Sequence, residues 1–319
     1  MKNIILSTDN NFVQHCAVTM TSILEQNNCV CFYILTEGLS PENEQILNDL
    51  VGSYHSTLMF LNIDSSIVEK FPMPQNVGFS HISVATYYRL FIASLLPKDI
   101  DKALYLDCDI VVRGALDELF ETVIDGYSLG AVFQDDPLLL RGDEFERLGL
   151  SNKVGYFNAG VLLINLKYWR ENNVEKQLLD FISNHTADIR FHDQDTLNAV
   201  LASSTYTLDC KWNTLTIFLT KAIYRFTSPR CKKYRSQLFE GTGKNPCVVH
   251  FVSRPKPWEW SCSHPFKKDY YTYLDKTVYR GWRPKWKKTL KEVVERVKNY
   301  PILRGSGVFS DLGIFLRFR

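Results

Sequence analysis

Residues 102–112 read KALYLDCDIVV, the most continuous apolar stretch of the chain, interrupted only by two aspartates. Strands of a parallel sheet are buried on both faces and are therefore almost wholly apolar. We expect this stretch to form one central strand of such a sheet. Because residues i and i+2 of an extended strand point to the same side, Asp107 and Asp109 are expected to project together from its carboxyl end. Ligands of open α/β sheets bind outside the carboxyl ends of strands.

Strand-like and helix-like stretches alternate on both sides of this segment, which is typical of an α/β fold. Ser40 precedes Pro41 and two glutamates, a pattern that predicts the first turn of a helix. The other expected strands cover residues 3–6, 31–35, 58–63, 128–133 and 160–166, and the other expected helices cover 14–27, 85–96 and 195–201. We predict a mostly parallel central sheet flanked by helices, in a domain that ends near residue 275.

Two buried carboxylates repel each other unless a cation or hydrogen-bond donors compensate their charges. A divalent metal would compensate Asp107 and Asp109 together, and turn or capping hydrogen bonds are the alternative. His250 ends the short apolar stretch CVVH of residues 247–250 and is a candidate third ligand, although a histidine at a strand end often has a structural role. Two carboxylates and one imidazole suit Mn²⁺ better than Mg²⁺, which prefers oxygen ligands alone.

Lys256 follows His250 by six residues, within the segment RPKPW of residues 254–258. Pro255 and Pro257 are expected to hold this loop extended, which would fix the lysine ammonium near the metal. A fixed cation beside a metal is suited to binding a diphosphate. The alternative is a solvated surface loop in which Trp258 is buried.

The chain of 319 residues is 45% hydrophobic and 23% charged, as in ordinary globular proteins. It has no apolar run of about 18 residues, and its start, MKNIILSTDN, soon turns polar. We therefore expect neither a membrane-spanning helix nor a secretory signal, and a cytoplasmic location. The eight cysteines include no CxxC pair and are expected to be reduced thiols rather than disulfides or zinc ligands.

Residues 276–319 hold twelve Lys and Arg residues but only three acidic ones, together with several aromatic residues. This composition favours an anionic membrane surface as a partner, because basic residues near anionic headgroups contribute about 1 kcal/mol each and aromatic side chains lie at the interface. No nucleic-acid-binding module is visible in the sequence. We expect a domain of residues 1–275 and a tail of residues 276–319 that docks peripherally on the inner face of the cell membrane. A solvated tail is the alternative.

Six blocks in a fixed order resemble family 8 of the retaining glycosyltransferases, which have the GT-A fold and use nucleotide sugars. The blocks are STDNNF at 7–12, ISVATYYRL at 82–90, LYLDCDIVV at 104–112, YFNAGVLLINL at 156–166, HDQDTLNAVL at 192–201 and HFVSRPKPW at 250–258. The sequence is most similar to the bacterial lipopolysaccharide galactosyl- and glucosyltransferases of that family. The resemblance therefore implies a UDP-hexose donor and a saccharide or glycolipid acceptor.

The resemblance also implies roles for individual residues. Asp107, Asp109 and His250 would bind Mn²⁺, and Lys256 would bind the donor diphosphate. The other implied contacts to the nucleotide sugar come from Ser7, Thr8, Asp9, Asn11, Phe12, Arg89, Cys108, Asn158, Ala159, Asp193, Gln194 and Ser253. Asp9, Asn11 and Phe12 would lie at the nucleoside, and Asn158, Ala159 and Asp193 at the hexose. From the residues alone, a solvated charge is the alternative for Arg89 and a helix N-cap for Asp193. For Asn158 and Ala159 the alternative is a turn, with Gly160 giving the backbone freedom before the next strand.

Asp193 and Gln194 are the implied catalytic pair. An amide oxygen is a weak nucleophile, so we expect the acceptor hydroxyl to attack on the face that the diphosphate leaves, while Gln194 steadies the anomeric carbon electrostatically. A phosphatase with a nucleophilic aspartate is disfavoured, because Ile110 and Val111 follow the motif where Gly-Thr is usual. A sugar-nucleotide-binding protein without turnover is the remaining alternative.

Overall fold

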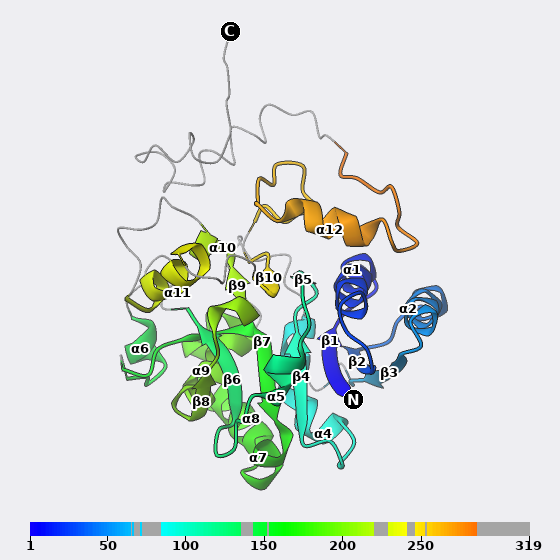
Figure 1. Ribbon diagram of the computed structural model, residues 1–319. Coiled ribbons are helices and arrows are strands. Elements are labelled where there is room, and N and C mark those ends of the chain that lie inside the picture. The colour runs from blue at the N-terminus through cyan, green and yellow to red at the C-terminus, as the bar shows by residue number, and fades with distance from the viewer. Residues whose placement is uncertain are drawn as a thin grey trace.

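The computed structural model describes residues 1–64, 66, 71, 84–134, 143–151, 153–219, 229–240, 246–252 and 254–285. Within them a seven-stranded sheet has the strand order β3-β2-β1-β4-β7-β6-β8 (Figure 1). Its strands are β1 (Lys2–Ser7), β2 (Val30–Thr36), β3 (Thr57–Asn62), β4 (Lys102–Leu106), β6 (Leu129–Phe133), β7 (Phe157–Asn165) and β8 (Thr205–Thr207). The predicted mostly parallel central sheet is confirmed, with β7 antiparallel to both of its neighbours.

Helices cover both faces of the sheet, which is why all seven residues of β2 are buried. On β1, Ile4 and Leu6 pack into one apolar cluster with α1 and α2, while Ile5 packs into a second cluster with η1, α7, α8 and α9. The bounds of these helices are α1 (Val13–Leu24), α2 (Pro41–Ser53), η1 (Val84–Phe91), α7 (Leu166–Glu171), α8 (Val174–Asn184) and α9 (His192–Leu201). As predicted, Ser40 caps α2 by accepting a hydrogen bond from the Asn43 backbone, and Pro41 opens the helix.

A second sheet of three short strands lies beyond the carboxyl end of β4 and was not predicted. It comprises β5 (Ile110–Val112), β10 (Val248–His250) and β9 (Thr214–Leu215). β10 is antiparallel to β5 and parallel to β9. The stretch 102–112 is therefore two strands in two sheets, and the prediction of one continuous strand is wrong.

The other helical segments are short, apart from the last two, α11 and α12, in the following set. They are α4 (Ile92–Leu95), α5 (Asp117–Glu121), α6 (Glu144–Arg147), η2 (Thr186–Asp188), η3 (Ala202–Ser204), η4 (Cys210–Trp212), α10 (Thr216–Leu219), α11 (Pro229–Glu240) and α12 (Lys267–Leu274). The predicted helix over 85–96 is a 3₁₀ segment, η1, followed by one turn of α-helix, α4. In the part of the chain that the structure describes, no helix is both long and apolar enough to cross a bilayer.

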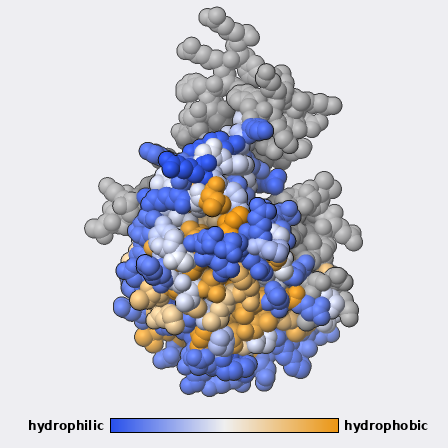
Figure 2. Space-filling model, turned by 90° about the vertical axis from the view of Figure 1, so that its right-hand side faces the viewer, coloured by the Kyte–Doolittle hydropathy of each residue, from blue (hydrophilic) through white to orange (hydrophobic). Residues whose placement is uncertain are grey.

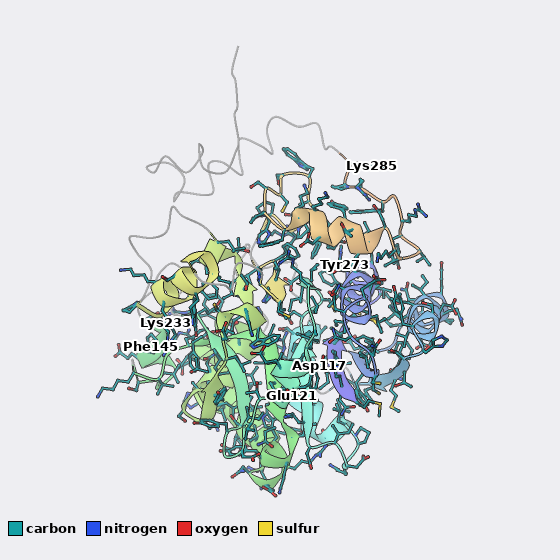
Figure 3. All side chains as sticks on the ribbon, in the orientation of Figure 1. Asp117, Glu121, Phe145, Lys233, Tyr273 and Lys285 are labelled. Carbon is teal, nitrogen blue, oxygen red and sulfur yellow. The ribbon has the colours of Figure 1, made fainter. Side chains whose placement is uncertain are left out.

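α12 packs against α1, and both helices contribute to one apolar cluster with the small sheet. Tyr273, labelled in Figure 3, lies between these two helices, and its hydroxyl accepts a hydrogen bond from Gln26 at 3.4 Å. On the side of α2 and the edge strand β3, Figure 2 shows apolar patches between hydrophilic residues, and Met59 of β3 is 47% exposed there. The cysteines whose side chains are described are free thiols, as expected.

Candidate active site

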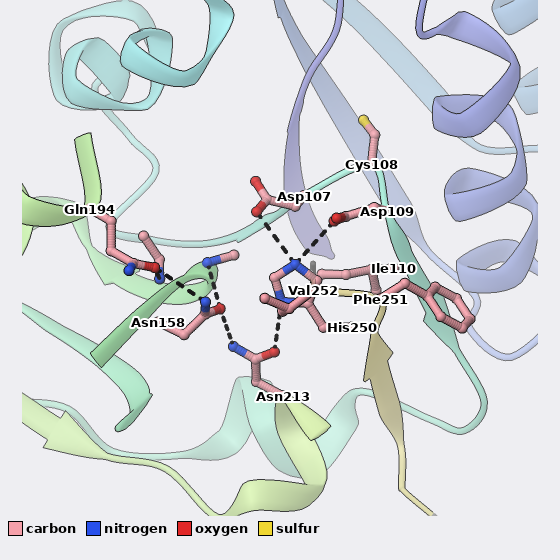
Figure 4. A network of polar contacts seen from close by, with 12 residues as sticks. Asp107, Cys108, Asp109, Ile110, Asn158, Gln194, Asn213, His250, Phe251 and Val252 are labelled. Carbon is pink, nitrogen blue, oxygen red and sulfur yellow. Dashed lines mark hydrogen bonds and ion pairs between the residues drawn. The ribbon is translucent and has the colours of Figure 1, made fainter. Parts of the chain in front are cut away.

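Asp107 and Asp109 lie in the turn between β4 and β5, and His250 ends β10. The antiparallel register pairs His250 with Ile110, which brings the imidazole beside the turn (Figure 4). His250 Nε2 is 3.0 Å from Asp109 Oδ1 and 3.7 Å from Asp107 Oδ2. One ligand atom of each residue lies within 4.8 Å of the others. The structure therefore brings together the three residues predicted to bind a metal.

The two aspartates do not share one extended strand, so the prediction that strand alternation brings them together is wrong. The Asp107 backbone N–H still donates to Gly160 O of β7 at 2.9 Å, but residues 108 and 109 turn the chain toward the small sheet. Thr19 Oγ1 of α1 fixes this turn by donating to the carbonyls of Cys108, at 3.1 Å, and Ile110, at 2.9 Å. The turn, rather than strand alternation, aims both carboxylates at His250.

Lys256 supplies a cation beside this cluster. Its Nζ lies 2.5 Å from Asp109 Oδ2 and donates to Phe251 O at 2.6 Å. Burial alone would raise the pKa of Asp109, but the neighbouring ammonium of Lys256 outweighs burial and holds that pKa well below its ordinary value. The expected extended loop is wrong, because residues 254–255 bend and residues 257–261 form turns and a bend. The bent loop still places Lys256 at the cluster.

The donor atoms of the cluster fit a divalent metal. Asp109 Oδ1 is buried and has no hydrogen-bond partner among the described residues, although a buried carboxylate oxygen normally has one. It lies 3.0 Å from His250 Nε2, and with a neutral imidazole unprotonated at this nitrogen two lone pairs converge on one point. Two oxygens and one nitrogen are donors that Mn²⁺ and its neighbours in the transition series accept. These three residues are therefore suited to hold a divalent cation.

Arg89 of η1 joins Asp107 to α9. Its NH2 group lies 2.9 Å from Asp107 Oδ1, its Nε lies 2.9 Å from Asp193 Oδ2, and its NH1 donates to Ala159 O at 2.6 Å. The guanidinium also lies over the Tyr105 ring, 4.3 Å from the centroid. Its side chain is only 7% exposed, so the alternative of a solvated charge is wrong.

Asp193 is the second residue of α9 and not its N-cap, which is Phe191. Burial raises the pKa of Asp193 to about 6, although Arg89 opposes this shift. The Arg89 Nε–H group donates to Thr86 O, so Asp193 Oδ2 has an ionic neighbour but no hydrogen-bond donor among the described residues. A buried carboxylate oxygen in this state is free to accept a hydrogen bond from a ligand hydroxyl.

Gln194 is held by the start of β7. Its Oε1 accepts hydrogen bonds from the Ala159 backbone at 3.0 Å and from Asn158 Nδ2 at 3.2 Å, and its Nε2 donates to the Tyr156 hydroxyl at 3.1 Å. Two of the residues predicted to contact the hexose, Asn158 and Ala159, thus hold the predicted catalytic residue Gln194.

The segment predicted to bind the nucleoside lies at the carboxyl end of β1, beside the aspartate turn. Cys108 Sγ lies 3.3 Å from Ser7 O, and Ser7 Oγ donates to Ala85 O at 2.8 Å. Asp9 Oδ1 accepts from the backbone N–H groups of Asn11 and Phe12 and so shapes the turn. Thr8 is buried, whereas the side chain of Asn11 is exposed.

Phe12 contacts protein aromatics. Its ring is T-shaped to His15, with centroids 4.6 Å apart, and to Trp258, with centroids 5.5 Å apart. Trp258 in turn stacks on His15 at 3.7 Å. The loop that carries Lys256 is thereby packed against the start of α1. Ser253, the remaining predicted contact, lies outside the described residues, as does most of the basic tail.

Sequence reasoning missed three residues of the site: Tyr105, Tyr156 and Asn213. Tyr105 donates to Asp107 Oδ1 at 3.1 Å, and Asn213 Oδ1 lies 3.1 Å from His250 Nδ1. The signal that was available for Asn213 is a polar residue directly before the short strand β9. The strand expected over residues 160–166 is β7 and already begins at Phe157, so Asn158 and Ala159 lie in the strand and the alternative of a turn for them is wrong. A Cβ added at Gly160 would come 2.2 Å from His250 Cε1.

The chain is similar to known glycosyltransferases. A sequence model of glycosyl transferase family 8 matches residues 3–262. General stress protein A of Bacillus subtilis is 29% identical, over 87% of this chain and 94% of its own length. The lipopolysaccharide 1,3-galactosyltransferase of Salmonella typhimurium is 27% identical, over 82% of this chain and 74% of its own length. The structure of the galactosyltransferase LgtC with donor and acceptor sugar analogues matches with a TM-score of 0.73 at 25% identity, over 86% of this chain and 96% of LgtC. This likeness confirms the expected GT-A fold, and the chain belongs to glycosyl transferase family 8.

Proposed function

We propose that this glycosyltransferase moves a hexose, galactose or glucose, from a UDP-sugar to a saccharide acceptor of a cell-surface glycolipid or polysaccharide, with retention at the anomeric carbon and with Mn²⁺ as cofactor. The observation that carries the proposal is the convergence of Asp107, Asp109 and His250 beside the ammonium of Lys256. A metal-and-lysine pair suits a diphosphate, because both cations neutralise charge that develops as the sugar–phosphate bond breaks.

The donor would extend along the carboxyl edge of the large sheet. We assign the nucleoside to the segment from Ser7 to Phe12, because Cys108 joins this segment to the aspartate turn. Asp107, Asp109 and His250 would hold Mn²⁺, which when bound supplies a Lewis acid for the diphosphate oxygens. Lys256 would bind the same diphosphate directly.

We assign the hexose to the space bounded by Arg89, Asn158, Ala159, Asp193 and Gln194. Asp193 Oδ2 supports this assignment, since it is buried and lacks a hydrogen-bond donor that a sugar hydroxyl would supply. Arg89 binds both Asp107 and Asp193, so it holds the metal ligand and the hexose ligand at a fixed separation.

The proposed reaction is a substitution on one face of the sugar. The bond from the anomeric carbon to the diphosphate breaks, its electron pair leaves with the phosphate oxygen, and Lys256 stabilises that charge. The acceptor hydroxyl attacks the same face and passes its proton to the departing diphosphate. Both lone-pair directions of Gln194 Oε1 already accept hydrogen bonds, which favours electrostatic support of the anomeric carbon over covalent attack by this amide.

We further propose that residues 1–275 form the catalytic domain and that the tail of residues 276–319 docks on the inner face of the cell membrane, where a lipid-linked acceptor would be found. Trp282, 38% exposed, and Val278, 68% exposed, lie near Arg280 and Lys285 at the start of this tail and support docking. The name of the Salmonella relative, a lipopolysaccharide galactosyltransferase, supports a glycolipid acceptor. A variant truncated at residue 276 should keep its turnover in solution and associate more weakly with anionic vesicles. Unchanged vesicle association would contradict membrane docking.

The test of the catalytic proposal is a panel of UDP-sugars with Mn²⁺, scored for slow hydrolysis without acceptor. One UDP-hexose should be hydrolysed, and Asp109→Ala should abolish metal-dependent UDP binding. Asp117→Ala is the matched control, because Asp117 is an exposed aspartate that pairs with Lys2 on the surface. Binding without any turnover would leave a non-catalytic sugar-nucleotide-binding protein, and no binding of any UDP-sugar would contradict the proposal altogether.

A further inference from the structure

A chain of side-chain amides, half-buried at Gln194 and buried beyond it, runs from α9 to the imidazole of His250 (Figure 4). Gln194, Asn158 and Asn213 follow one another in this chain and come from α9, from β7 and from the residue that precedes β9. Asn158 is 5% exposed, Asn213 is fully buried and His250 is 3% exposed. Water therefore does not compete for these hydrogen bonds.

The backbone of β7 fixes which way each amide points. The Gly160 N–H group donates to Asn158 at 3.0 Å, so the Asn158 atom that it meets must be the oxygen. That oxygen also accepts a hydrogen bond from Asn213 at 2.8 Å, so the Asn213 atom must be the nitrogen. The other Asn213 atom, the carbonyl oxygen, consequently faces His250 Nδ1 at 3.1 Å.

The opposite end of the chain gives the same polarity independently. The Ala159 N–H group donates to Gln194 Oε1 at 3.0 Å. Asn158 meets this oxygen at 3.2 Å with its other side-chain atom, which must then be the amide nitrogen. Two backbone donors therefore agree on the orientation of Asn158.

A carbonyl oxygen only accepts hydrogen bonds, so His250 must carry its proton on Nδ1. In a neutral imidazole Nε2 is then an unprotonated nitrogen, and Nε2 is the atom that lies 3.0 Å from Asp109 Oδ1. Hydrogen bonds to the far nitrogen of a metal-binding histidine fix both its tautomer and its ring orientation.

We propose that Asn213 is a positioning residue that holds His250 in the tautomer with a free Nε2 aimed between Asp107 and Asp109, ready to ligate the cation. This inference rests on the metal site of the proposed function and assigns a role to a residue that the resemblance did not include. Gly160 and Asn158 act through Asn213, because they set its polarity.

The first test measures the tautomer in metal-free protein at alkaline pH. Long-range ¹H–¹⁵N correlations of ¹⁵N-histidine-labelled protein distinguish protonation at Nδ1 from protonation at Nε2, and His250→Gln identifies the His250 signals. Wild type should show Nδ1–H. Asn213→Ala should show a mixture of tautomers. An Nε2–H pattern in the wild type would overturn the inference.

The second test is the Mn²⁺ affinity, read from the spectrum of free Mn²⁺ by electron paramagnetic resonance. Asn213→Ala should bind Mn²⁺ about 10–100-fold more weakly. Asn27→Ala is the matched control, because Asn27 is also buried but bonds only the backbones of Ile23 and Leu116. An equal loss in Asn27→Ala, or wild-type affinity in Asn213→Ala, would refute the role. If wild type binds no Mn²⁺, the proposed metal fails and the tautomer test still decides the role of Asn213.

Discussion

Replacing Gly160 by alanine should disable the metal site without removing any ligand. The added Cβ would lie 2.2 Å from His250 Cε1, 2.7 Å from Asp107 Oδ2 and 2.8 Å from His250 Nδ1. Non-bonded carbon atoms approach to about 3.5 Å, so the imidazole would have to move by about 1.3 Å. Metal–ligand distances tolerate only about 0.2 Å. His250 can then no longer ligate the same cation as the aspartates.

The expected loss of Mn²⁺ affinity is about 100-fold or more, beyond what the removal of an outer hydrogen-bond partner usually costs. The same overpacking should lower the free energy of unfolding by about 1–3 kcal/mol. Titration with Mn²⁺ followed by electron paramagnetic resonance measures the first effect, and urea denaturation measures the second.

Gly130→Ala is the matched control for a Cβ added inside the same sheet. Its nearest contact would be Leu208 Cδ2 at 3.1 Å, the end of a flexible side chain away from the metal ligands. This variant should lose some stability and keep its Mn²⁺ affinity. Wild-type Mn²⁺ affinity in Gly160→Ala would refute the argument, because it would mean that the imidazole does not lie against β7 when the metal is bound.

Three further outcomes are expected. Arg89→Met should lower the free energy of unfolding by about 3–5 kcal/mol, because it leaves a buried carboxylate unpaired; urea denaturation measures this, and combination with Asp193→Asn should recover part of the loss. Burial lowers the pKa of His264 from 6.5 to about 4, so the unfolded chain binds the proton first as the pH falls. The titration of this histidine thus leaves wild-type stability unchanged above pH 6.5 and lowers it by up to about 3 kcal/mol toward pH 4; melting temperatures should therefore shift in favour of His264→Leu, which lacks this titration, as the pH falls from 6.5 to 4, and a difference that stays constant would contradict the argument. A chelator should abolish UDP-sugar turnover, and Mn²⁺ should restore it better than Mg²⁺; full turnover in the chelator would contradict the assigned cofactor.

Local signals predicted the first half of the sheet well. Ser40 is the N-cap and Pro41 the first residue of α2, and both residue types favour these positions. The strand β2 is apolar up to Thr36 because both of its faces are covered. The helix start depends on residues adjacent in the sequence, and the apolar strand depends on burial alone. Both are properties that composition and spacing record.

The small sheet could not be predicted in the same way. The apolar stretch 102–112 has the same character before and after the aspartates, so nothing in its composition marks the change from one sheet to another. The direction of β7 is equally invisible, because alternation of side chains does not distinguish a parallel from an antiparallel strand. Both features follow from pairing with segments far away, such as β10 for β5.

The convergence at the metal site was predicted from chemistry, whereas the amide chain behind it was not. Asn213 follows Trp212 in a region where periodicity is weak, and its role depends on Gly160 and Asn158, more than fifty residues earlier. A buried polar chain is tolerated only when its members are satisfied. Where the row of amides ends, at His250, the imidazole Nε2 faces Asp109 Oδ1. This buried oxygen has no hydrogen-bond partner among the described residues. The network is therefore incomplete at the one point where a cation would complete it.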